Sequence, residues 1–410
     1  MTDRTPFFAG LTLGLAGGRN RRPNQKAAHL RPVYPPRQEN HDMVADQINQ
    51  QRQRIDEIDR QIVDLLNERA LCAMAIGRSK NAGGLPEFAP EREQAIIDAL
   101  ERHNQGPLSG QSLRGIFAEI ISACRAVQRP LRVAFLGPAT TFSHQAAMRH
   151  FGSSCEFAPH RSIIDVFHEV ERSHAQVGVV PVENSSEGQV SVTLDLFLES
   201  DLNVCGEIYA RISQVLMSKE AAIEGIQRVY SHPQALNQCR NWLARNMPMA
   251  TLIESTSTAA AAQKAAQEDG SAAVGSILAA RQGGLNALAI DIQDNPHNTT
   301  RFFVIGRQKC PPTGNDKTSI LFVTHHKPGM LFSALKHFAD SGINLTRIES
   351  RPLKNTPWEY VFFIDMAGHV EDAQVRQVIN TLDEETRLLK VLGSYPMGEP
   401  EAWNGAEQAV

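Results

Sequence analysis

The change in pattern at Arg129-Pro130 constrains the fold more than any other feature of the chain. Before it, residues 44–129 carry apolar side chains at helical spacing, such as Ile58 and Ile62. After it, short apolar strands alternate with helical stretches over about 180 residues, the pattern of an α/β domain. A chain of 410 residues is too long for one ordinary core. We therefore expect an all-helical domain followed by at least one α/β domain.

The helical part, 44–129, divides at its glycines and prolines. We expect a long helix over about 47–80, which Gly83-Gly84 ends, and a second helix that starts near Pro90 and ends by Gly106. A third is expected over about 111–128. One long and two shorter helices make a poor core for a monomer, so pairing with a second copy of the chain is predicted.

The second part, 131–308, reads as two α/β lobes with a ligand crevice between them. Its expected strands are "LRVAFLG", "VGVVPVEN", "NVCGEIYA", "RVYSH", "ATLIES", "SAAVGS" and "RFFVIG". The prolines and glycine of "KCPPTGNDK", 309–317, predict a linker. Residues 318–396 then show the order β-α-β-β-α-β, which is that of a ferredoxin-like α+β domain. The tail, 397–410, is expected to be loose.

The first 43 residues differ from the rest because they are rich in Arg, Pro and Gly and poor in acids. This composition predicts a disordered extension. The short apolar run "FFAGLTLGLAGG" precedes its basic residues, the wrong order for a secretory signal. A start at Met43 is the preferred interpretation, and a targeting role is the alternative.

Composition excludes several classes of function. The net charge of −4 argues against non-specific nucleic-acid binding. No apolar window approaches the roughly 20 residues of a membrane span. The six cysteines are scattered without a CxxC pair. We therefore expect no metal site, no disulfide scaffold and a reducing, cytoplasmic location.

Three cations mark the first helix, namely Arg52, Arg69 and Lys80. Arg69 and Lys80 are three turns apart and share a face. Arg52 lies 17 residues before Arg69, or roughly 25 Å along the axis, too far to reach the same small ligand. An antiparallel dimer would bring Arg52 of one copy beside Arg69 and Lys80 of the other. The alternative is three solvated surface cations.

The pattern "R..I..ID..I..LL..R" over 52–69, followed by Lys80, "PERE" at 90–93 and Gln128, resembles the all-helical chorismate mutase family. The resemblance implies a dimer that rearranges chorismate to prephenate by positioning and charge stabilisation alone. It also implies roles for individual residues. Arg69 and the second copy's Arg52 would hold carboxylates, Lys80 and Gln128 would donate to the ether oxygen, and Glu93, supported by Arg92, would accept the substrate hydroxyl.

Two positions depart from that family's pattern. Ala89 stands where some members have an acid, and Cys124 stands where some have a serine. Hydroxyl binding would then rest on Glu93 alone, which puts affinity in doubt more than activity. Cys124 remains a candidate substrate contact.

Polar residues follow the expected strands of the α/β part. The carboxyl ends of strands in open α/β sheets face the ligand crevice. We therefore expect convergence there of Thr141, Ser143, Glu183, Asn184, Ser231, Gln238, Ser255, Ser257, Thr300 and Arg301. Helix capping is the alternative for Ser143 and Ser257, and a solvent-facing position is the alternative for Gln238.

The stretches "RVAFLGPATTFSHQAA", "VVPVENSSEGQV", "YSHPQALNQC", "ESTSTAAA" and "NTTRFFVIG" resemble the prephenate dehydratases, in the same order. The resemblance spans 132–306 and implies loss of CO2 and hydroxide from prephenate. It assigns the proton donor to Thr300 rather than Thr299, and gives Arg301 either a carboxylate or a bracing role. A Ser231–His232 nucleophile is disfavoured because adjacent strand residues point to opposite faces.

The last unit, 318–396, resembles the ACT domains, which bind phenylalanine at dimer interfaces in this family. Gly329-Met330-Leu331 opens its first helix and Glu349-Ser350-Arg351 closes its second strand. Met330 replaces a small residue of some members. The alternative is a fold module without a ligand.

Together these patterns predict a bifunctional chorismate mutase and prephenate dehydratase with phenylalanine feedback. We expect no cofactor, no metal, no nucleic acid and no membrane, and a homodimer or larger homo-oligomer. Two alternatives remain open. One is a dehydratase whose helical part only dimerises, and the other is a non-catalytic amino-acid sensor.

Overall fold

The computed structural model describes the chain in four stretches, which are 37–83, 88–325, 327–353 and 359–398. The chain divides into two compact units at Val63/Asp64. Among the described residues no helix is both long and apolar enough to cross a membrane.

In the first unit, the described residues belong to helix α1 (Arg37–Gly83), which continues into the second unit. The helix begins at Arg37, so residues 37–43 are helical where disorder was expected. The rest of the expected disordered extension, 1–36, lies outside the described residues, as does most of the expected tail, from 399 on.

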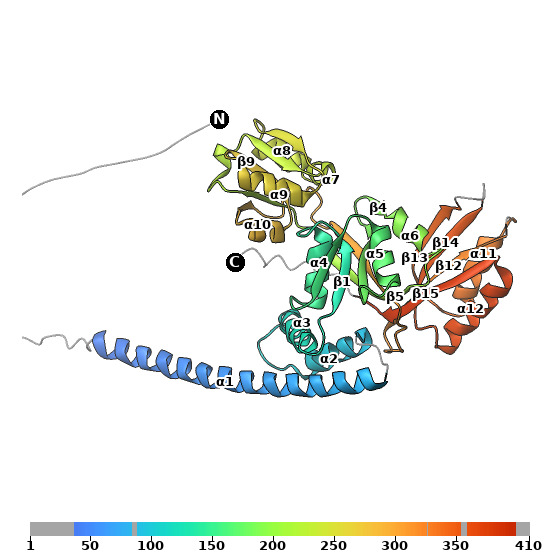
Figure 1. Ribbon diagram of the computed structural model, residues 1–410, viewed down its shortest axis with the longest axis horizontal. Coiled ribbons are helices and arrows are strands. Elements are labelled where there is room, and N and C mark those ends of the chain that lie inside the picture. The colour runs from blue at the N-terminus through green and yellow to red at the C-terminus, as the bar shows by residue number, and fades with distance from the viewer. Residues whose placement is uncertain (1–36, 84–87, 326, 354–358, 399–410) are drawn as a thin grey trace, which may run out of the picture. The chain divides into compact units, whose positions relative to one another are not determined.

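The second unit opens with the end of α1, followed by α2 (Pro90–His103) and α3 (Gly110–Ala126). Proline and acids in the first turn start α2, and the Ser109 side chain accepts the Ser112 N–H at 3.1 Å to cap α3. The two helices pack together, as Figure 1 shows, and Arg114 of α3 binds Glu101 of α2 through two nitrogens. The expected helical order is confirmed.

The first α/β lobe is built on a sheet in the order β2-β1-β3-β11-β5, with β4 beside β3. Strands β1, β2 and β3 are parallel, and β11 is antiparallel to both of its neighbours. The strands are β1 (Arg132–Leu136), β2 (Glu156–His160), β3 (Val177–Asn184), β4 (Gly188–Gln189), β5 (Asn203–Arg211) and β11 (Thr299–Gly306).

Helices cover both faces of this sheet. Helix α4 packs on one core, with Phe302 and Val304 of β11. Helices α5 and α6 pack on the other, with Phe303 and Ile305. The alternation along β11 thus sends successive side chains to different cores. The helices are α4 (Phe142–Phe151), α5 (Ile163–Glu171) and α6 (Ser191–Leu196).

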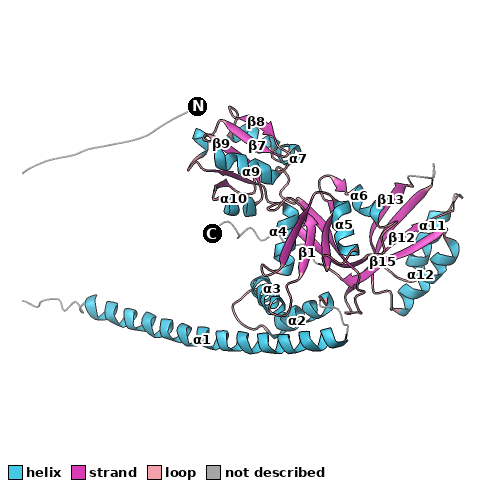
Figure 2. Ribbon diagram, viewed as in Figure 1, coloured by secondary structure: helices cyan, strands magenta, loops and turns pink. Residues whose placement is uncertain are grey.

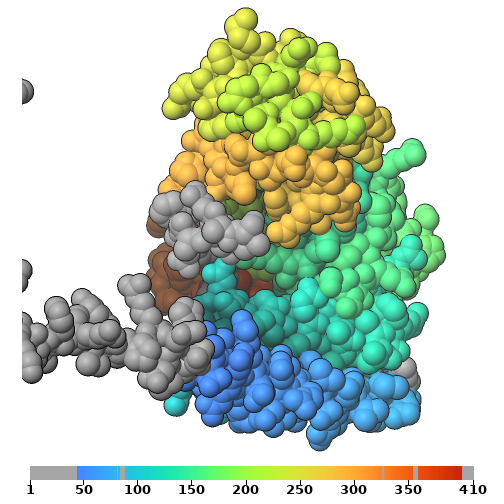
Figure 3. All heavy atoms as spheres, turned by 90° about the vertical axis from the view of Figure 1, so that its left-hand side faces the viewer, coloured from blue at the N-terminus to red at the C-terminus, as the bar shows by residue number. Residues whose placement is uncertain are grey.

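The second lobe carries a sheet in the order β10-β6-β9-β7-β8, in which β7, β8 and β9 are parallel. It forms the yellow mass at the top of Figure 3. Its strands are β6 (Val215–Ser218), β7 (Arg228–Ser231), β8 (Thr251–Glu254), β9 (Ser271–Gly275) and β10 (Asn286–Ala289). Its helices are η1 (Ile223–Gly225), α7 (Pro233–Gln238), α8 (Arg240–Asn246), α9 (Thr258–Gln267) and α10 (Ile277–Gly283).

The last domain is a sheet in the order β13-β14-β12-β15 with two helices, visible at the right of Figure 2. This is the expected ferredoxin-like arrangement. Its elements are β12 (Asp316–Val323), α11 (Met330–Asp340), β13 (Leu345–Pro352), β14 (Tyr360–Ala367), α12 (Ala373–Glu385) and β15 (Leu388–Pro396). Strand β12 includes the last two residues of the expected linker, Asp316 and Lys317.

This domain shares a hydrophobic core with the first lobe. One face of its sheet packs under α11 and α12, while Leu321, Phe363 and Tyr395 on the other face join the core that contains Phe303. The contact is close, since a Cβ added at Gly393 of β15 would lie 2.2 Å from the Val204 carbonyl oxygen of β5. The two domains are therefore joined by packing, not only by the linker.

Candidate active sites and effector cavity

Three of the expected dehydratase residues meet at one edge of the first lobe. Because β1 and β3 are parallel and β11 runs against β3, the ends of β1 and β3 and the start of β11 lie along the same edge. That edge carries Thr141, Asn184 and Thr300. Thr141 accepts the His144 N–H at 3.4 Å and so caps α4.

A β-bulge lies in β3 directly before Glu183 and Asn184. In the pairing of β3 with β11, Phe302 faces Pro181 and Arg301 faces Glu183, which leaves Val182 as the extra residue. Simple alternation would send Asn184 to the same core as Val180 and Val182. The bulge shifts that alternation, so Asn184 meets Thr300 while Glu183 faces the last domain.

The hydroxyl of Thr300 is buried and oriented by one amide. Asn184 Nδ2 donates to Thr300 Oγ1 at 2.8 Å and to Asn298 Oδ1 at 3.0 Å. In the part of the chain that the structure describes, Thr300 Oγ1 donates to no protein group. Its proton is therefore available to a bound molecule.

Two contacts connect the lobes at this edge. Ser276, directly after β9, donates to the Thr140 carbonyl oxygen at 2.6 Å. Glu187, after β3, accepts from Gln238 Nε2 at 2.9 Å and from Gln234. Gln238 is thus half-buried between the lobes rather than free in solvent.

The expected serines have different surroundings. Ser257 caps α9 by accepting the Ala260 N–H, as the capping alternative predicted, whereas Ser143 is buried in the first turn of α4 and is not its cap. Ser231 is fully buried and donates to the Val274 carbonyl oxygen at 2.6 Å. Ser255 is buried at the end of β8, and its Oγ finds no partner among the described residues.

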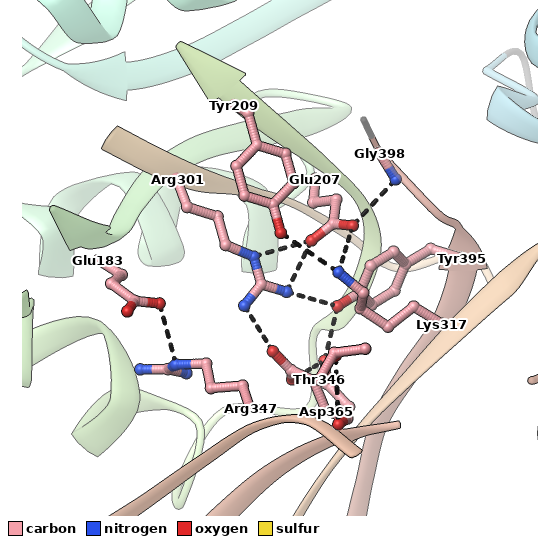
Figure 4. Close-up of polar contacts among 11 residues, drawn as sticks. Glu183, Glu207, Tyr209, Arg301, Lys317, Thr346, Arg347, Asp365, Tyr395 and Gly398 are labelled. Carbon is pink, nitrogen blue, oxygen red and sulfur yellow. Dashed lines mark hydrogen bonds and ion pairs between the residues drawn. The ribbon is translucent and has the colours of Figure 1, made fainter. Parts of the chain in front are cut away.

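Arg301 points into a buried charge cluster (Figure 4), and alternation along β11 puts it on the opposite face of the strand from Thr300. Its Nε binds Glu207 at 2.8 Å and its Nη1 binds Asp365 of the last domain at 2.5 Å. Lys317 of β12 also binds Glu207, at 2.7 Å. All four side chains are at most 6% exposed. Two positive and two negative charges therefore compensate each other inside the contact between the first lobe and the last domain.

The cluster keeps Arg301 charged. Burial by itself would lower the pKa of Arg301, but the Tyr395 hydroxyl and the carboxylates of Asp365 and Glu207 outweigh it and raise that pKa. Arg301 is also 4.9 Å from the Phe303 ring centre, on the same face of β11. This arrangement favours the bracing role expected of Arg301 over contact with a ligand carboxylate.

In the second unit, several expected mutase residues lie close together. Glu93 of α2 binds Arg125 of α3 at 2.5 Å. Burial raises the pKa of Glu93, and the nearby charges of Arg125 and Lys80 partly offset this rise. A Cβ added at Gly77 would lie 2.5 Å from Gln128 Oε1, so Gln128 rests against α1. Lys80, Glu93 and Gln128 thus belong to one region.

The remaining mutase candidates differ in exposure. Arg69 is half-buried, Arg92 is exposed and Cys124 is buried. Arg52 is exposed on the part of α1 in the first unit.

The effector candidates fall into two groups. Gly329, Met330 and Leu331 line a cavity of ≈ 330 Å³, together with Thr324, His325, Lys327, Phe332, Glu359, Tyr360 and Phe362. Glu349, Ser350 and Arg351 lie on β13 and are not part of this cavity's lining. Arg351 instead binds Asp195 of α6 at 2.9 Å.

The residues with prominent contacts that were not expected from the sequence include Arg125, Ser276, Arg347 and Asp365. Each acts across a domain or lobe boundary, where partners are remote in sequence. A charged residue inside an apolar strand was the available signal for Asp365 in "YVFFIDM". Among the described residues no cluster of three or more His, Cys, Asp or Glu side chains is arranged to hold a metal ion.

Comparison with known proteins matches three family models in order along the chain. They are chorismate mutase type II over residues 51–129, prephenate dehydratase over 133–310 and the ACT domain over 318–384.

Similar proteins match most of the chain. A bifunctional chorismate mutase/prephenate dehydratase of Aquifex aeolicus is 48% identical over 86% of this chain and 98% of its own length. One of Stutzerimonas stutzeri is 45% identical with the same coverage. Among solved structures, a prephenate dehydratase of Arthrobacter aurescens in complex with L-Phe is 34% identical, with a TM-score of 0.61 over 66% of this chain and 92% of that one.

Proposed function

Because the chain belongs to the family of bifunctional chorismate mutase/prephenate dehydratases, we propose that its helical domain converts chorismate to prephenate and its α/β lobes convert prephenate to phenylpyruvate. Matches over both catalytic regions favour this function over the two alternatives, a dehydratase with a structural helical part and a non-catalytic sensor.

The hydrogen bond from Asn184 to Thr300 carries the proposal for the dehydratase site. In dehydration, the bond between the ring and its carboxylate breaks and CO2 leaves. The electron pair enters the ring, which becomes aromatic, and the hydroxyl leaves and takes a proton to form water. Asn184 holds the oxygen of Thr300 as an acceptor, so the Thr300 proton is free to point at the leaving hydroxyl. Helix α4, capped by Thr141, presents N–H groups that suit a carboxylate.

Replacing each of the two neighbouring threonines by alanine, in separate variants, tests this assignment. Thr300→Ala should lower the dehydratase kcat by about 100-fold or more, because the positioned donor is lost. Thr299→Ala is the matched control, since Thr299 Oγ1 bonds only to the nearby His297 carbonyl oxygen among the described residues. Mutase activity should persist in both variants. Equal dehydratase rates in the two variants would refute the role of Thr300.

For the mutase, we place Arg69, Lys80 and Gln128 around the substrate, with Glu93 at its hydroxyl and Arg92 and Cys124 nearby. The proximity of Lys80, Glu93 and Gln128 supports this assignment. Arg52 would come from a second copy. Purified protein given chorismate should form phenylpyruvate, and Arg69→Ala should stop this while prephenate is still consumed. Loss of both activities would argue against independent sites.

For the last domain, we propose phenylalanine as a feedback effector. The cavity lined by Gly329, Met330 and Leu331 supports a small ligand. The segment Glu349-Ser350-Arg351 of a second copy would contribute through the exposed Ser350, because Glu349 and Arg351 lie on the face of β13 turned to the first lobe. We also propose a homodimer or larger homo-oligomer and a cytoplasmic location, which the six free cysteines support. No cofactor enters either proposed reaction.

A further inference from the structure

One ion pair reaches from the last domain to a strand of the dehydratase site. Arg347 Nε, on β13, lies 3.2 Å from Glu183 Oε2, on β3 (Figure 4). The Arg347 side chain is only 9% exposed, whereas Glu183 is 43% exposed. Holding a long cation in this buried position requires a partner, and Glu183 is the carboxylate that provides it.

Glu183 is joined directly to the residue that orients Thr300. It directly follows Val182, the extra residue of the β3 bulge, and is paired with Arg301. The next residue, Asn184, turns to the opposite side and binds Thr300 Oγ1 at 2.8 Å. Because the ladder of hydrogen bonds is locally disrupted at a bulge, a contact that holds Glu183 also restrains the direction of Asn184.

We propose that Arg347 is a positioning residue of the dehydratase reaction, which acts through Glu183 and Asn184 on Thr300. The inference rests on the proposed role of Thr300. It makes a residue of the effector domain part of the structure that holds the proton donor, although Arg347 itself touches no reacting atom.

The position of Arg347 on β13 strengthens this inference. Along this strand Arg347, Glu349 and Arg351 are half-buried, while Thr346, Ile348 and Ser350 are exposed. The half-buried face is attached to the first lobe at two points, through Arg347 to Glu183 and through Arg351 to Asp195. A shift of β13 would therefore move Glu183 and, with it, the bulge of β3.

The first experiment compares Arg347→Met, which keeps the apolar stem, with Arg347→Lys, which keeps the charge. Arg347→Met should lower the dehydratase kcat about 10- to 100-fold, as small misplacements of reacting groups do, with a much smaller change in KM. Arg347→Lys should recover part of the loss. Mutase activity of the same polypeptide should stay within twofold and reports that the protein is folded. Arg376→Ala, at an exposed arginine of α12, is the matched control.

The second experiment is a double-mutant cycle with Glu183→Gln. If Arg347 acts through Glu183, the double variant should be no slower than the slower single variant. Independent, multiplying losses would overturn the proposal, as would a wild-type kcat in Arg347→Met. A wild-type kcat in Glu183→Gln would overturn it too, and Thr300→Ala would then show whether the proposed dehydratase site itself still stands.

Discussion

The buried side chain of Arg125 connects the helical domain with the first dehydratase lobe. It binds Glu93 at 2.5 Å, the Phe151 carbonyl oxygen at 2.9 Å and Cys155 Sγ at 3.3 Å, and is 8% exposed. Its guanidinium also lies 5.8 Å from the Phe88 ring centre. The proposed mutase residue Glu93 is thereby held against the first dehydratase lobe, and its charge is stabilised by a residue outside the family's motif.

Removal of this arginine should change the pH dependence of the mutase. Burial raises the pKa of Glu93 and Arg125 offsets part of that rise, so Arg125→Gln should leave a still higher pKa. If the ionised carboxylate accepts the substrate hydroxyl, kcat/KM for chorismate should then decline at a higher pH on the acid side. The measurement is a pH profile of the mutase from acid to neutral pH.

Arg114→Gln provides the control for this profile. It breaks the other ion pair between α2 and α3, with Glu101, but leaves Glu93 paired. If kcat/KM for chorismate declined over the same acid pH range in wild type and Arg125→Gln, the assignment of Glu93 as the group that accepts the substrate hydroxyl would be contradicted.

At the scale of elements, α1 carries many apolar side chains that the single chain leaves exposed. In the first unit Ile48, Ile55, Ile58 and Ile62 are 40–55% exposed, and in the second Leu65 and Leu71 are 64% and 65% exposed. Clusters of exposed large apolar residues indicate an interaction surface. A second copy of the chain would cover them, as the sequence pattern predicted.

A charge on this face of α1 should prevent the pairing. Ile55→Glu should lower the mass measured by light scattering toward that of the monomer, because a buried carboxylate would have no partner. Mutase activity should fall with it, since Arg52 would no longer reach the second copy's site. Gln53→Glu adds the same charge at about 200° around the helix and should leave mass and activity unchanged. An unchanged mass in Ile55→Glu would exclude this face as the interface.

At the scale of the whole molecule, the dehydratase and ACT domains behave as one folded body. Apolar residues of both form one core, and the buried cluster of Arg301, Glu207, Lys317 and Asp365 crosses the same contact. Buried charges are costly unless they are paired, so each member depends on the others.

Loss of one carboxylate from the cluster should therefore lower the stability of the protein markedly. Asp365→Asn should reduce the free energy of unfolding by about 3–5 kcal/mol, because part of the charge of Arg301 stays buried without its partner. Urea denaturation of the purified protein measures this loss. Asp340→Asn, which breaks an exposed pair with Lys336, should cost under about 1 kcal/mol. Similar values for the two variants would mean that the cluster is not stabilising.

Local signals in the sequence determined the class and order of the elements. Helical periodicity, the glycines and prolines between segments and the apolar runs predicted three helices, an α/β part and a β-α-β-β-α-β unit. Strands β2, β4, β6 and β10 were not singled out. The edge strand β2 contains Pro159, and the "NALA" of β10 has little preference for a strand.

Only the tertiary structure decided which neighbours in sequence act together. Glu183 and Asn184, like Thr300 and Arg301, were expected to converge at one crevice. The alternation of β11 and the bulge in β3 send Asn184 and Thr300 to one side and Glu183 and Arg301 to the other. Their partners, Arg347 and Asp365, lie more than 60 residues away along the chain. Such pairings depend on how sheets pack, which local periodicity does not encode.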